Sequence, residues 1–377
     1  MPVPHHLRGR EIPPTTREYQ WVASIVEAVE RRTGRPSSWN RRLYEELTGT
    51  GGTAQIDGPM TINRQLVLEP VMRAYDATGA LGLEDTGGAR IAVMLVVHET
   101  DHHQHEVGEE DAPDAVRFDS MEAEVVTEGL ADSNRDRIVD QIITDIAMDK
   151  AIPRIHDVQA VMPYAGYQAG VEGVLNGLHT ISGRSRAEVH AAVDGTPFVQ
   201  RYNAMADVVI DSRLANLMPP EHRSQIRLRL SQPLRAELGS LGNYSAENEP
   251  PVELAARGRE TAARAVQQLE RELGAIEQHY RQYGEHPPRM PMSSQERAQV
   301  QRIETYYGRP SIDLETSHLR QFLDTGAQAG LAGGGAAAGA GAAAGGGAAA
   351  SAAAAAAPAD FAAWRTATPR STDGQAR

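Results

Sequence analysis

The sequence contains no cysteine, which excludes disulfide bonds and every metal site built on thiolate ligands. A metal ion in this chain would need histidine and carboxylate ligands instead. Lysine is nearly absent as well: Lys150 is the only one, so almost all positive charge comes from arginine. We interpret this bias as a trace of high-GC codon usage rather than as a nucleic-acid site.

Acidic residues outnumber basic ones, 50 to 37, which gives a net charge of −13. This balance argues against a nucleic acid or an anionic membrane as the main partner. There is no run of 18 large apolar residues, and residues 1–6 lack the apolar core of a signal peptide. We therefore expect a cytoplasmic protein, while export without a cleavable signal stays open.

The apolar spacing predicts a mainly α fold with a small β part (α+β). Residues 17–46 look helical, with a break at 34–38 that separates two helices. Residues 55–63 form two short alternating arms around an Asp-Gly turn, which predicts a β-hairpin. Residues 66–68 suggest a third strand, and Pro70 suits the first turn of a helix that ends near residue 77.

Helical patterns fill most of the remaining chain. An apolar helix is expected at 89–107, followed after an acidic break by a long helix at 114–148. Further helices are predicted at 168–181, 185–193, 198–217, 221–230 and, as a long charged amphipathic helix, 252–282, with shorter ones to about residue 325.

The apolar run of residues 91–97 leads directly into His98, Glu99 and, four residues after His98, His102. Residues i and i+4 share one face of a helix, so both imidazoles can point at one ion. The spacing H-E-x-x-H is typical of zinc sites in which the two histidines are ligands and the glutamate is a general base. This pattern predicts a zinc ion held near residues 98–102.

A second pattern, E-G-L-A-D at residues 128–132, lies on the following predicted helix. Together the two patterns resemble the gluzincin branch of the zincin metallopeptidases over residues 98–132. The resemblance implies a zincin-like site on two helices, with Zn²⁺ held by His98, His102 and Glu128. It also implies that Glu99 is the catalytic base and that Asp132 hydrogen-bonds a ligand histidine from outside the ligand set.

Several residues near the motif leave alternatives open. Glu122 and Glu124 lie at plausible distances from His102 for a third ligand. His103 falls on another face of the helix and is expected to face solvent, whereas His105 lies one turn beyond His102, in a supporting or solvated position. Asp101 puts a charge where the family usually has an uncharged residue.

The resemblance suggests two further features. Zincins often use a Tyr or His to stabilise the oxyanion, and the candidates by position are Tyr164, Tyr167, His156 and His179. For any single one of them, ordinary packing is the simpler interpretation. The predicted hairpin could align a substrate backbone by strand addition, or it could serve packing alone.

These observations divide the chain into a disordered N-terminus (1–16), a zincin-like catalytic domain (17–235), a helical region (236–325) and a disordered Gly/Ala-rich tail (326–377). The predicted function is zinc-dependent hydrolysis of a peptide or protein substrate, without nucleic acid or membrane partners.

Two other classes remain open. The first is a helical scaffold in which H-E-x-x-H is not catalytic. The second is a carboxylate-bridged di-iron protein, because residues 99–102 and 315–318 both read E-x-x-H.

Overall fold

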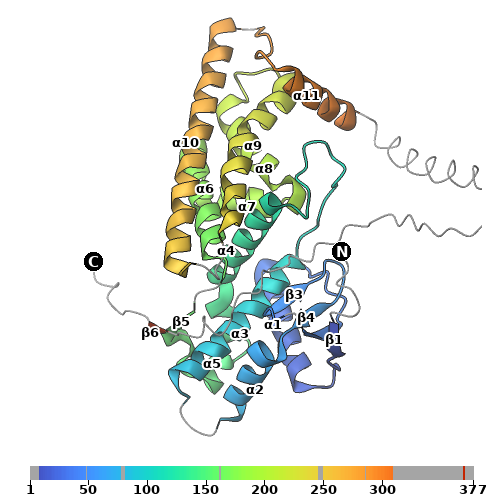
Figure 1. Cartoon of the computed structure of the whole chain (residues 1–377), viewed down its shortest axis with the longest axis vertical. Helices are drawn as coiled ribbons and strands as arrows, with labels where there is room; N and C mark the ends of the chain where they lie inside the picture. The colour runs from blue at the N-terminus through green and yellow to red at the C-terminus, as the bar shows by residue number, and fades with distance from the viewer. Residues whose placement is uncertain are drawn as a thin grey trace, which may run out of the picture.

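The computed structural model describes residues 8–47, 49–77, 81–160, 163–244, 249–284, 286–308 and 368–369. Within them the chain is mainly helical with one small mixed sheet, which confirms the predicted fold class. Figure 1 shows a lower body that holds the sheet and an upper body made of helices. Each body has its own hydrophobic cluster.

The sheet contains β1 (Arg8–Glu11), β2 (Leu43–Glu46), β3 (Gly52–Ala54) and β4 (Met60–Ile62) in the order β1-β2-β4-β3. β3 and β4 pair antiparallel around the Asp-Gly turn, which confirms the predicted hairpin, but its first strand covers residues 52–54 and so begins before the predicted range of 55–63. β2 pairs parallel with β4 and antiparallel with β1. β3 is therefore an edge strand, and it lies beside the helix that bears the H-E-x-x-H motif.

Three local predictions are wrong in this region. Disorder does not extend over residues 8–16, because β1 pairs with β2; residues 1–7 lie outside the described part. Leu43 belongs to a strand rather than a helix, since its partner is Met60 of β4. Residues 64–68 form a π-helical turn instead of a strand, with the Asn63 side chain accepting a hydrogen bond from the Leu66 amide.

The lower body is completed by α1 (Arg17–Thr33), α2 (Glu69–Asp76), α3 (Leu83–His102), α5 (Met148–Ala151), a 3-10 turn (Ile155–Asp157) and β5 (Val158–Gln159), which pairs with β6 (Thr368–Pro369). The side chain of Thr16 caps α1, and Gly34 ends it in the left-handed conformation. Pro70 occupies the first turn of α2 as predicted.

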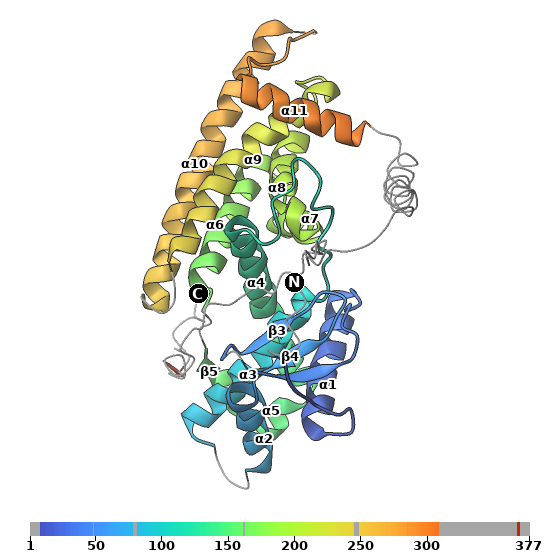
Figure 2. The ribbon, with the colours of Figure 1, turned by 45° about the vertical axis from the view of Figure 1, so that its right-hand side comes forward.

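Helix α4 (Met121–Asp145) connects the two bodies (Figures 1 and 2). Its first half, around Val126 and Leu130, packs into the upper core, and its second half, around Val139 and Ile142, packs into the lower core. The helix starts later than predicted, because Ser120 caps its N-terminus through a hydrogen bond from the Ala123 amide.

The upper body contains α6 (Ala165–Ser182), α7 (Arg186–Asp194), α8 (Arg201–Val209), α9 (Arg223–Gly239), α10 (Pro251–Tyr283) and α11 (Ser294–Tyr307), with short turns at Phe198–Gln200, Ile210–Leu214, Pro220–His222 and Ser240–Asn243. The amphipathic α10 lies along α6 and α9, so its apolar stripe is buried within this chain. Leu234 and Leu238 belong to one hydrophobic core, so the domain boundary predicted between residues 235 and 236 falls within that core.

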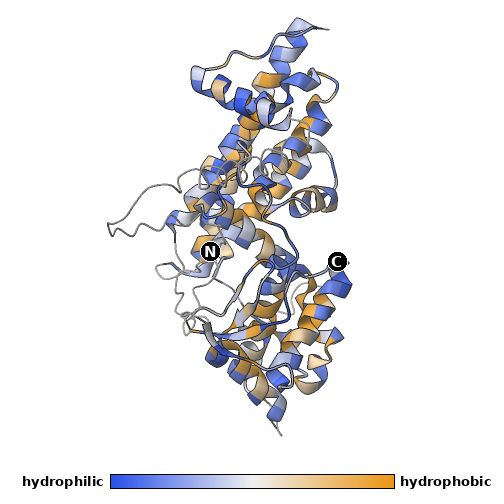
Figure 3. Cartoon of the chain, turned by 90° about the vertical axis from the view of Figure 1, so that its right-hand side faces the viewer, coloured by the Kyte–Doolittle hydropathy of each residue, from blue (hydrophilic) through white to orange (hydrophobic). Residues whose placement is uncertain are grey.

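Hydrophobic residues run along the helices of both bodies (Figure 3). None of the helices in the described part is both long and apolar enough to cross a membrane. The Gly/Ala-rich tail lies outside the described residues, apart from Thr368–Pro369.

Candidate metal centre

Helix α3 brings the H-E-x-x-H motif to the junction of the two cores. It is buried on nearly every side from Thr86 to His102, as its apolar run predicts, and it ends at His102 rather than at residue 107. α4 passes beside it and presents the middle of its own sequence to the end of α3. The site is therefore built from two helices, with its polar groups enclosed between two apolar regions.

The structure brings His98, His102 and Glu128 together. His98 Nε2 lies 2.9 Å from Glu128 Oε2 and 3.0 Å from His102 Nε2. His102 Nε2 lies 3.5 Å from Glu128 Oε1. All three side chains are buried. For comparison, ligand atoms about 2.1 Å from a tetrahedral zinc ion lie about 3.4 Å from one another.

The hydrogen bond between His98 and Asp132 determines which nitrogen of His98 faces Glu128 without a proton. His98 Nδ1 lies 2.8 Å from Asp132 Oδ1, and only the imidazole can donate in that pair. A neutral His98 then points a bare lone pair from Nε2 at the Glu128 carboxylate. Two lone pairs at this distance repel unless a proton or a metal ion lies between them. The donor set thus fits a cation, and two histidines with one carboxylate suit zinc.

The ionisation of these groups supports the same interpretation. Burial opposes charge on His98, but its hydrogen bonds to Asp132 and Glu128 raise its pKa well above the usual value. Burial alone would raise the pKa of Glu128, but the positive charge of His102 and hydrogen bonds from both histidines lower it. Without a metal, the cluster therefore favours a carboxylate paired with a protonated imidazole.

Glu99 lies on the side of α3 that faces the sheet. It is buried, and burial is the largest cause of its raised pKa. The charges of His98 and His102, and then a hydrogen bond from the Ala54 backbone, oppose this effect. β3 passes so close that a Cβ atom on Gly52 would lie 3.1 Å from Glu99 Cγ. The edge strand and the predicted base are therefore direct neighbours.

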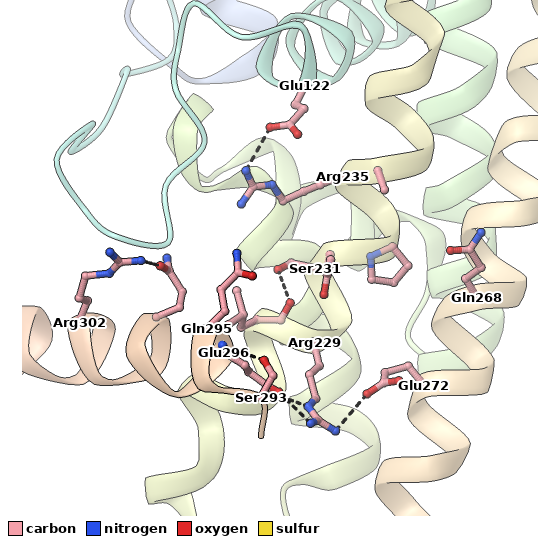
Figure 4. A pocket seen from close by; sticks show the side chains of 15 residues that line it. Glu122, Arg229, Ser231, Arg235, Gln268, Glu272, Ser293, Gln295, Glu296 and Arg302 are labelled. Carbon is pink, nitrogen blue, oxygen red and sulfur yellow. Dashed lines mark hydrogen bonds and ion pairs between the residues drawn. The ribbon is translucent and has the colours of Figure 1, made fainter. Parts of the chain in front are cut away.

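The two alternative third ligands lie elsewhere or at the margin of the site. Glu122 points into a separate cleft of about 950 Å³ between α9, α10 and α11, where its carboxylate lies 3.1 Å from Arg235 (Figure 4). Arg229 in the same cleft pairs with Glu296. Glu124 is half-buried one turn before Glu128, and burial together with the Glu128 charge raises its pKa to about 7.

Of the four oxyanion candidates, Tyr164 is the one that contacts a proposed ligand. Its ring stacks on His98 at 6.0 Å, and Tyr167 stacks on Tyr164. Burial, followed by the charges of Glu128, Glu124 and Glu99, raises the pKa of Tyr164 well above its usual value.

The two histidine candidates have other partners. His156 lies 3.2 Å from Asp140, and His179 lies 2.5 Å from the Arg184 carbonyl.

Of the two histidines that follow the motif, His103 differs from its prediction, and His105 lies in a buried position that excludes only the solvated alternative. His103 was expected to face solvent but is only 1% exposed, and burial followed by the charge of His102 lowers its pKa to about 3. The turn at the end of α3 is held against the loop between α1 and β2, since the Ser38 amide donates to the His103 carbonyl. His105 is buried as well and lies near Asp101 and Asp194.

Sequence reasoning missed two residues that shape the site. Arg135 is buried and donates to Asp132 Oδ1, the oxygen that also accepts from His98; its position one turn after Asp132 was an available signal. At Gly129 a Cβ atom would lie 2.8 Å from the Tyr167 carbonyl oxygen. The glycine therefore permits α4 and α6 to approach closely beside Glu128.

No family model, curated protein or solved structure matches this chain. The second E-x-x-H sequence, at residues 315–318, lies outside the described residues.

Proposed function

We propose that this protein is a zinc-dependent hydrolase that cleaves peptide bonds. The observation that carries the proposal is the convergence of His98, His102 and Glu128 on one buried point, with Asp132 fixing the tautomer of His98. This arrangement is the one that the gluzincin resemblance implies. A zinc ion bound there would act as a Lewis acid towards water and carbonyl groups.

Glu99 would move the proton in this reaction. A carboxylate with a pKa raised by burial is a better proton acceptor near neutral pH than an ordinary glutamate. The nearby charges of His98 and His102 and the hydrogen bond from the Ala54 backbone lower this pKa, but they do not reverse the effect of burial. Glu99 can therefore take a proton from water and pass it to the leaving amine.

Tyr164 would stabilise negative charge on the substrate. With its pKa held high by burial and nearby carboxylates, the phenol stays protonated and can donate a hydrogen bond at any physiological pH. Its ring is held by stacking between His98 and Tyr167.

A peptide substrate is favoured by the position of β3. An extended peptide can add to an edge strand through backbone hydrogen bonds, and this edge lies directly beside Glu99. A substrate aligned there would run past the base and the proposed metal ligands.

The test uses the purified full chain and a pool of quenched fluorescent peptides. We expect hydrolysis that a chelator abolishes and that zinc restores. Glu99→Gln should keep its metal and lose about 10²–10⁴-fold in rate, the usual contribution of a general base. Glu84→Gln, an exposed position on the same helix, should match the wild type. Full activity in Glu99→Gln, or cleavage indifferent to chelation, would refute the proposal.

A further inference from the structure

A second group of buried ligand-type side chains lies next to the first. It consists of Asp101, His105 and Asp194, whose donor atoms all lie within 4.8 Å of one another. Asp101 lies in the last turn of α3, His105 lies in the turn that follows this helix, and Asp194 is the last residue of α7. The group thus connects the motif helix of the lower body to the upper body.

Two of the three donor atoms have no hydrogen-bond partner in the described part of the chain. Asp101 Oδ2 and His105 Nε2 are both buried and form no hydrogen bond there. They lie 3.6 Å apart, and His105 Nε2 lies 3.5 Å from Asp194 Oδ1. These separations are too long for good hydrogen bonds, yet they match the spacing of about 3.4 Å between ligands of a tetrahedral ion with bonds of about 2.1 Å.

The surrounding residues hold the carboxylates in this arrangement. Asn134 of α4 donates from one amide nitrogen to Asp101 Oδ1 at 2.8 Å and to Asp194 Oδ1 at 2.7 Å. Arg35 pairs with the other oxygen of Asp194 at 2.5 Å. Asp101 Oδ2 is thereby left pointing at His105.

The Arg201 guanidinium lies close to this group but forms no hydrogen bond with it in the described residues. Arg201 is fully buried, and its guanidinium lies 4.5 Å from the centre of the Phe198 ring. Its three side-chain nitrogens have no hydrogen-bond partner in the described residues. Asp101 Oδ2 and His105 Nε2 consequently make only long ion-pair contacts and lack the hydrogen bonds that buried polar atoms normally form.

We propose that Asp101, His105 and Asp194 bind a second divalent metal ion, distinct from the one at His98, His102 and Glu128. One imidazole with two carboxylates suits zinc or manganese better than calcium or magnesium, which take oxygen ligands. The ion would be structural, because it fixes the end of α3 against α7. It gives Asp101, the residue that fits the zincin motif least, a function of its own.

Metal content tests this site independently of any activity. The full chain is stripped with a chelator, loaded with Zn²⁺, freed of excess ion and measured by elemental mass spectrometry. We expect two zinc ions per chain in the wild type and one in Asp194→Asn. The variant His98→Ala/Glu128→Gln should also keep one, and adding Asp194→Asn to it should leave none.

Two further variants distinguish the loss of a metal ligand from the loss of folded structure. His105→Phe keeps a ring against Phe198 but removes the donor atom, so it should lose one zinc as Asp194→Asn does. Asp207→Asn removes a carboxylate that is paired with Arg223 in the upper body and should keep both ions. One zinc in the wild type, unchanged by Asp194→Asn and His105→Phe, would overturn the proposal and leave a metal-free ion-pair cluster.

Discussion

Asp132 Oδ1 lies 2.8 Å from His98 Nδ1, and both groups are buried. This one contact fixes the tautomer of His98 and directs its other nitrogen at Glu128. Arg135 donates to the same oxygen, so the carboxylate is itself held in place. The proposed ligand is therefore oriented by a chain of three residues from two helices.

Removing the charge of Asp132 should weaken metal binding without removing a ligand. Asp132→Asn replaces an acceptor with an amide that can donate to Nδ1, which favours the wrong tautomer of His98. Loss of such a partner typically costs 10–100-fold in metal affinity, and we expect about this loss here. The measurement is zinc competition against a chromophoric chelator. Asp145→Asn, near the far end of α4, is the matched control and should bind zinc as the wild type does; equal affinities for all three proteins would contradict the assigned role.

The close approach at Gly129 predicts an unusual response to alanine. Alanine normally stabilises a helix by about 1 kcal/mol relative to glycine. At Gly129 its Cβ would press on the Tyr167 carbonyl and on Val171, so we expect Gly129→Ala to be destabilised by about 1–3 kcal/mol.

Gly274 provides the comparison within the same protein. It lies inside α10, and a Cβ atom there would meet nothing within 4 Å. Gly274→Ala should therefore gain about 0.5–1 kcal/mol. Urea unfolding of both variants measures the contrast. If both substitutions stabilise the protein, α4 and α6 do not pack as closely as described.

Glu124 should make the metal-free protein less stable as the pH rises. Burial and then the Glu128 charge raise its pKa from 4.5 to about 7 in the folded state. The folded protein then binds a proton that the unfolded chain releases, so this contribution is complete below pH 4.5 and is lost as the pH rises through about 7. Urea unfolding of chelated protein over this range should show a smaller loss for Glu124→Gln. Parallel curves for variant and wild type would disprove this origin.

Much of the fold follows from local sequence patterns. The H-E-x-x-H spacing placed His98 and His102 on one face of a helix, and the E-x-x-x-D spacing placed Glu128 and Asp132 one turn apart on the next. The Asp-Gly turn predicted the hairpin, and Pro70 predicted the start of α2. Each of these signals acts within four or five residues, where helix and turn geometry decides the outcome.

The parts that were wrong or missed depend on distant contacts. Leu43 joins a strand because Met60 of β4 offers a place in the sheet, and nothing within its own segment signals this. His103 and His105 become buried because Ser38 and Asp194, far along the chain in both directions, close over the end of α3. Helical periodicity describes the faces of an isolated helix but not which of them other elements cover.

In the proposed metal site Glu128, rather than Glu124 one turn earlier, is the third ligand beside His98 and His102. Metal content of two matched variants tests this assignment most directly. Glu128→Gln should contain one zinc ion fewer per chain than the wild type, whereas Glu124→Gln should contain the wild-type number. The opposite pattern, with the ion lost from Glu124→Gln and kept in Glu128→Gln, would show that Glu124 is the third ligand instead.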